Sequence, residues 1–68
     1  MELSSRNQLS ATVTEVRLGT VMAEVTMRLS DGQELVSAIT RRSAERLNLS
    51  EGDQVTAFIK ATEVLIGK

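Results

Sequence analysis

The sequence has no histidine, cysteine, tryptophan or tyrosine, and it has a single phenylalanine, Phe58. Histidine is the side chain that titrates near neutral pH, and histidine and cysteine are common ligands of transition metals. The sequence therefore lacks the residues that usually transfer protons near neutral pH or bind metals through nitrogen or sulfur. We expect a binding protein that is not an enzyme and has no metal centre of its own.

Aromatic residues are nearly absent, and the chain has no excess of positive charge. The chain has eight Lys and Arg residues and nine Asp and Glu residues, so its formal net charge is -1. Single-stranded nucleic acid is usually bound by aromatic stacking surfaces in a basic groove, and we expect no nucleic-acid partner. No stretch approaches the roughly 20 apolar residues of a membrane span, and no basic segment followed by an apolar run opens the chain. We expect a cytoplasmic protein without a membrane partner.

Proline is absent too, and no linker or low-complexity stretch divides the 68 residues. We therefore expect a single domain over residues 1–68. A domain of this size buries only about 60% of the surface that its unfolded chain exposes. Because there are no cysteines for disulfides, association with further copies is the remaining way to bury more apolar surface. The sequence predicts a homo-oligomer.

Alternation of apolar and polar residues predicts the first three strands. It is clearest over residues 21–29 and typical of a half-buried strand. Residues 9–18 alternate as well, but the apolar phase shifts between Val13 and Val16, which predicts a β-bulge. Asp31-Gly32 favours a tight hairpin turn into a return strand over residues 34–39.

A short helix and two more strands are expected in the second half. Thr40 suits the N-cap of a helix over residues 41–47, and strands over residues 54–60 and 62–66 follow. This order is typical of an all-β fold, a small five-stranded OB-like Greek-key barrel with one short helix between strands 3 and 4. Apolar residues on both faces of several strands indicate contact with another subunit.

Hydroxyl and cationic side chains gather in three places. Ser4 and Arg6 precede the first strand, Thr40 and Ser43 lie at the helix start, and Lys60 ends the fourth strand. Alone, each group has an ordinary explanation as a frayed tail, a helix cap or a solvent-exposed lysine. Together they are suitable donors for a tetrahedral oxyanion, which leaves water only when hydrogen bonds replace its hydration.

Several motifs resemble those of the molbindins, small molybdate- and tungstate-binding proteins built on the transport-associated OB (TOBE) domain. The match spans the whole chain. The motifs that carry it are Ser-Ser-Arg-Asn-Gln-Leu at residues 4–9, Ala-Glu-Val at 23–25, Ser-Ala-Ile-Thr at 37–40, Ser-Ala-Glu-Arg-Leu at 43–47, Glu-Gly at 51–52 and Ile-Lys-Ala-Thr-Glu-Val at 59–64. Ser5 stands where the family usually has Ala, and Ala38 replaces a bulkier aliphatic residue.

The resemblance implies reversible binding of molybdate or tungstate at subunit interfaces for intracellular storage or homeostasis. It implies a hexamer assembled as a trimer of dimers, with further anion sites on threefold axes. The implied ligand-binding residues are Ser4 and Arg6 from one subunit, and Thr40, Ser43, Lys60 and the Ala61 backbone from another.

Three other functions stay open at this point. A ligand-free oligomerisation module of OB type would have the same fold and assembly without an anion. An OB-type nucleic-acid module is disfavoured by the single Phe58 and the net negative charge. An enzyme would need a base beside Ser4 or Ser43, and Lys60 is the sole candidate.

Overall fold

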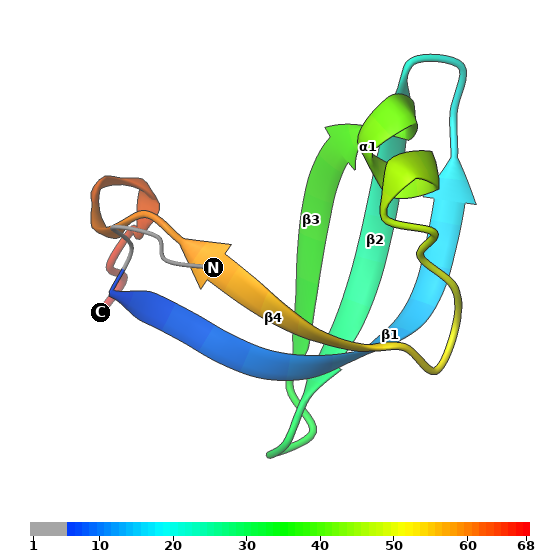
Figure 1. Cartoon of the computed structure of the whole chain (residues 1–68). Coiled ribbons are helices and arrows are strands. Elements are labelled where there is room, and N and C mark those ends of the chain that lie inside the picture. The colour runs from blue at the N-terminus through cyan, green and yellow to red at the C-terminus, as the bar shows by residue number, and fades with distance from the viewer. Residues whose placement is uncertain (1–5) are drawn as a thin grey trace.

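A strongly curved antiparallel sheet with strand order β3-β2-β1-β4 forms the body of the molecule (Figure 1). It is seen in a computed structural model, which describes residues 6–68. The elements are β1 (Asn7–Leu18), β2 (Met22–Leu29), β3 (Glu34–Thr40), helix α1 (Arg41–Arg46), β4 (Gln54–Ile59) and the 3-10 turn η1 (Ala61–Glu63).

Strand β1 is shared between two neighbours. Its first half pairs with β4, from Asn7 opposite Ile59 to Thr12 opposite Gln54. Its second half pairs with β2, ending with Leu18 opposite Ala23. Near the middle of β1 the hydrogen-bonded neighbour changes from β4 to β2. The strand bends there, and the sheet curls around one face.

The bulge predicted from the shifted apolar phase is confirmed. The register with β2 slips between Val13 and Glu15, so Thr14 is the extra residue. The Thr14 hydroxyl donates a hydrogen bond of 3.1 Å to the backbone oxygen of Thr26. A bulge adds local twist and bend, which agrees with the curvature of β1 at this point.

The core is small and contains no aromatic ring among its buried members. The buried apolar residues of the described chain are Ala11, Val13, Ala23, Val25, Met27 and Ala44. Val13 is the most deeply buried, with 1% of its surface exposed, whereas Phe58 is 37% exposed. Since β1 and β2 supply all of the core except Ala44 of α1, the apolar faces of β3 and β4 are only partly covered.

The expected turns and helix end are also present. Gly32 has a φ of 91°, as the Asp-Gly hairpin requires. Hydrogen bonds from the side chain and backbone of Gln33 hold the pKa of Asp31 below its usual value. Helix α1 begins after its N-cap, Thr40, and is followed by Asn48 in the left-handed region with a φ of 53°.

The predicted strand over residues 62–66 is wrong, so the described chain has four strands and not five. Instead, the Glu63 N–H donates to the Lys60 oxygen at 2.9 Å and forms the turn η1. The run Val-Leu-Ile at 64–66 does not alternate, and no described strand lies beside it to accept its hydrogen bonds. The all-β, OB-like fold class stands, and no helix in residues 6–68 is long and apolar enough to cross a membrane.

Gly52 provides a test of the backbone geometry that supports β1. It has a φ of 92° with no atom within 4 Å of an added Cβ, and its N–H donates to the Val13 oxygen at 2.8 Å. Gly52→Ala is therefore expected to lower the free energy of unfolding by about 1–2 kcal/mol through backbone strain alone. Gly67→Ala, equally uncrowded but not at positive φ, is the control for urea denaturation at fixed protein concentration. Equal effects of the two variants would contradict this.

Candidate functional site

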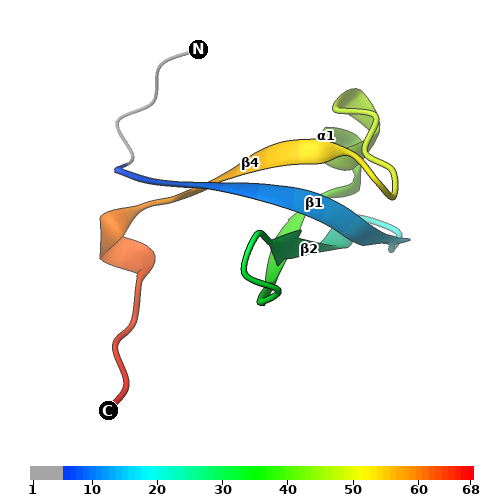
Figure 2. The same cartoon turned by 90° about the horizontal axis from the view of Figure 1, so that it is seen from below.

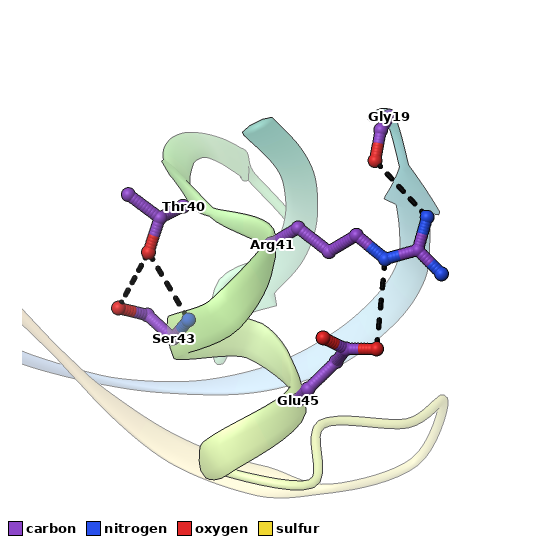
Figure 3. Close-up of polar contacts among 5 residues, drawn as sticks. All are labelled: Gly19, Thr40, Arg41, Ser43 and Glu45. Carbon is purple, nitrogen blue, oxygen red and sulfur yellow. Dashed lines mark hydrogen bonds and ion pairs between the residues drawn. The ribbon is translucent and has the colours of Figure 1, made fainter. Parts of the chain in front are cut away.

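Thr40 and Ser43 form a tight hydroxyl pair at the start of α1 (Figure 3). The Thr40 Oγ1 accepts a hydrogen bond of 3.1 Å from the Ser43 N–H and donates one of 2.8 Å to the Ser43 Oγ. Because a hydroxyl carries one proton and two acceptor positions, this arrangement leaves the Ser43 proton available for a ligand. Thr40 is exposed and Ser43 is half-buried, so the pair is accessible from solvent.

Arg41 fixes this helix start against the neighbouring hairpin. Its backbone N–H donates to the Val21 oxygen at 2.7 Å, and its guanidinium donates to the Gly19 oxygen at 3.3 Å. The same guanidinium lies 3.5 Å from the Glu45 carboxylate (Figure 3). The exposed ion pair contributes little stability, but the three contacts orient the Thr40 and Ser43 hydroxyls. The role of Arg41 was not predicted, because the sequence does not show that the 18–22 turn lies beside α1.

Arg6 and Lys60 lie together at the other end of the sheet. Asn7 pairs with Ile59, and the Asn7 side-chain amide donates to the Ile59 oxygen at 3.1 Å. Arg6 precedes Asn7 and Lys60 follows Ile59, so the two cations lie at the same end of the β1–β4 pair. Both are exposed, and neither forms an ion pair with another residue in the described range. Two cations at one end of the strand pair create a local positive potential that attracts an anion.

Ala61 directly follows Lys60 and opens η1. The first N–H groups of a helical turn have no carbonyl partner within that turn. The Ala61 backbone therefore adds a donor beside the Lys60 ammonium. Ser4, the remaining predicted residue, lies outside the described residues.

The two groups of donors lie at opposite ends of one copy. Thr40 pairs with Met22 beside the last residues of β1, whereas Lys60 follows the partner of Asn7, the first residue of β1. Figures 1 and 2 both show α1 and η1 at opposite ends of the molecule. At about 3.3 Å per residue, the 12-residue β1 separates them by a path on the order of 35 Å. The resemblance had implied that Thr40, Ser43 and Lys60 of one subunit bind the same anion. Within one copy, however, Lys60 lies at the opposite end from Thr40 and Ser43.

An apolar groove between β3 and β4 is a second feature, which the site prediction missed. It has a volume of about 400 Å³ and is lined by apolar side chains of both strands and of the 47–49 segment, among them Leu35, Ile39, Leu47, Leu49, Val55 and Phe58. The alternation over the two strands indicated these apolar faces, but not that they would stay uncovered. We call this feature the β3–β4 groove. No cluster of three or more metal-binding side chains occurs within the described range.

Comparison with known proteins agrees with this architecture. The family model described as the TOBE domain matches residues 3–66. A molybdate-binding protein from Sporomusa ovata has a solved structure that matches with a TM-score of 0.94 and 51% identity, with both chains covered completely. The molybdate-bound structure of the cytoplasmic molybdate-binding protein ModG matches with a TM-score of 0.85 and 39% identity, over 90% of this chain and 43% of that one.

A sequence relative gives the same result. The molybdenum-pterin-binding protein MopA of Rhodobacter capsulatus is 48% identical over 66 residues, which are 97% of this chain. The chain spans only a quarter of the length of MopA, 25%. This chain is therefore similar to only one part of that longer protein.

Thr40 offers a test that separates its capping role from its side-chain bulk. Thr40→Val removes both hydrogen bonds to Ser43 and is expected to lower the free energy of unfolding by about 1 kcal/mol. Thr40→Ser retains the hydroxyl and is expected to stay close to the parent protein. Urea denaturation at one protein concentration measures both. A loss in Thr40→Ser with none in Thr40→Val would mean that the methyl group, and not the cap, stabilises the helix start.

Proposed function

Because the chain belongs to the TOBE domain family, we propose that it binds molybdate reversibly, and tungstate in the same site. The observation that carries the proposal is the full-length structural match to the Sporomusa ovata molybdate-binding protein. In this proposal the protein stores or buffers the oxyanion in the cytoplasm and does not convert it chemically.

The donor set is suited to this ligand. Molybdate is a tetrahedral dianion that reaches the protein already surrounded by four oxygens, so it needs hydrogen-bond donors and positive charge, not metal ligands. Arg6 and Lys60 supply charge, while Thr40, Ser43 and the Ala61 backbone supply hydroxyl and amide donors. Charge-assisted hydrogen bonds to an oxyanion are stronger than neutral ones. We include Ser4 as a further hydroxyl donor.

We infer that the complete site lies between copies of the chain. The Thr40 and Ser43 hydroxyls of one copy are too far from its own Lys60 to contact the same small anion. A second copy that presents its Arg6 and Lys60 end to the hydroxyl pair solves this problem. We propose a homo-oligomer, specifically a hexamer built as a trimer of dimers.

Titration calorimetry with molybdate, tungstate and sulfate is the direct test. We expect binding of molybdate and tungstate, and weaker binding of sulfate, because the smaller ion cannot reach all donors of a cavity shaped for the larger ones. Absence of heat with molybdate at micromolar protein, together with no molybdenum in elemental analysis of the purified protein, would favour the ligand-free oligomerisation module instead.

Two charge variants test the placement of the site. Arg6→Ala and Lys60→Ala are each expected to weaken molybdate binding by roughly tenfold to a hundredfold, because each removes a charged donor worth about 1.5–3 kcal/mol. Arg28→Ala removes an equally exposed cation on β2 and is the matched control, expected to bind as the parent does.

Native mass spectrometry of the same variants reports the number of subunits and of bound ions together. The assembly should persist in all three. Parent-like affinity in both Arg6→Ala and Lys60→Ala would show that the site is elsewhere.

A further inference from the structure

The first turn of α1 has a charge pattern that opposes the helix. Arg41 and Arg42 are its first two residues, and the turn contains no acidic residue. The amino end of a helix carries a partial positive charge, so acidic side chains are favourable there and cations are unfavourable. Both arginines therefore lie where the helix alone would disfavour them. Local patterns that conflict with the fold are expected mainly at functional sites.

Arg41 has structural partners that account for its position. Its guanidinium lies 3.5 Å from the Glu45 carboxylate and donates a hydrogen bond of 3.3 Å to the Gly19 oxygen. Figure 3 shows its side chain extending away from the hydroxyls of Thr40 and Ser43. The charge of Arg41 is thus held apart from the hydroxyl pair and is offset by Glu45.

Arg42 has no such partner. It is exposed, and no ion pair within residues 6–68 includes it. It directly precedes Ser43, whose hydroxyl proton is available for a ligand because the Ser43 Oγ accepts from Thr40. The Arg42 guanidinium is therefore an uncompensated positive charge next to the hydroxyl pair.

The charge of the whole chain gives such a local cation a role. The formal net charge is -1, so the protein as a whole does not attract a dianion from solution. A charge at the rim of a binding site mainly changes the association rate and its salt dependence, whereas a group in direct contact changes the dissociation rate. Exposed charges are screened by salt, so the contribution of a rim charge falls as the ionic strength rises.

We propose that Arg42 captures the oxyanion for the Thr40 and Ser43 hydroxyls, raising the association rate from outside the set of donors that hold the bound ion. Glu45 limits this attraction, because its carboxylate offsets the neighbouring charge of Arg41. The inference rests on the proposed function, since it concerns the approach of molybdate to the same site. It assigns a role to a side chain that the predicted donor set does not contain.

Two substitutions test this by changing the local charge by one unit in opposite directions. Arg42→Gln removes the uncompensated cation, and Glu45→Gln removes the carboxylate that offsets Arg41. For a dianion and a unit charge about 8 Å apart in water, Coulomb's law gives a change of roughly threefold to sixfold at low salt. At about 10 mM salt we expect association slower by this factor in Arg42→Gln and faster by it in Glu45→Gln. At about 500 mM salt both variants should approach the parent.

Radioactive molybdate measures these rates without an optical probe, which suits a chain without tryptophan or tyrosine. Equilibrium dialysis of the intact protein gives the Kd, and a chase with unlabelled molybdate gives the dissociation rate. The dissociation rate divided by the Kd is the association rate. Arg28→Gln is the matched control, because Arg28 pairs with Glu34 at the end of β3 far from Thr40. It should change association by less than about twofold.

Parent-like association of Arg42→Gln at low salt would overturn the inference. Faster dissociation that persists at high salt would also overturn it, since Arg42 would then be a direct donor. Urea denaturation separates a structural role: the midpoint of Arg42→Gln should be unchanged or raised, because the helix disfavours this cation. A lowered midpoint together with slower association would assign Arg42 to the fold and overturn the inference.

The same measurements distinguish this inference from the proposed function. Failure of the parent protein to retain radioactive molybdate would reject the proposed function, and the capture role with it. Retention by the parent with equally fast association in Arg42→Gln would reject the capture role alone and leave the proposed function standing.

Discussion

The division of β1 between two partners is the constraint on which the rest of the structure depends. Its first half is bonded to β4 and its second half to β2, and the bulge at Thr14 lies near the change from one to the other. Val13, the most buried residue, lies at the same place, where its backbone bonds to both Gly52 and Asp53. The bend in one strand therefore sets the curvature of the sheet, the position of the core and the distance between the two ends.

Small size explains why the curl stays incomplete. A chain of 68 residues with one aromatic ring has little apolar volume, and within residues 6–68 the core is made of six buried residues of small to medium size. Leu35, Ile39 and Val55 are left only partly covered beside the groove. In a larger domain a further strand of the same copy would cover them. In the proposed function, both that surface and the donors at the two ends would be completed by a neighbouring copy, so the proposed association and the proposed anion site would share one structural cause.

Local patterns could be predicted from the sequence because their causes are local. The alternation over residues 21–29, the Asp-Gly turn at 31–32 and the cap at Thr40 each depend on neighbours a few residues away, and all are present. The bulge followed from a phase shift that any half-buried strand must accommodate. The contact between Thr40 and Ser43 was predicted correctly for the same reason, because the two residues are only three positions apart. The opposite placement of Lys60 depends on which end of β1 pairs with β4, and no short-range pattern encodes that.

The failed prediction at residues 62–66 has a different origin. The β-branched and aliphatic residues at 64–66 have the composition of a strand, and Val64 has strand-like backbone angles. A strand, however, exists only where another edge accepts its hydrogen bonds, and composition does not identify that edge or the copy to which it belongs. Apolar burial and backbone pairing stabilise a strand equally whether its partner is in the same chain or in another. What decides is the direction of the connecting turn, and η1 directs this segment outward. The composition of residues 64–66 thus favours a strand, but no edge in the described chain pairs with it, because the path of the chain after η1 carries the segment away from the sheet.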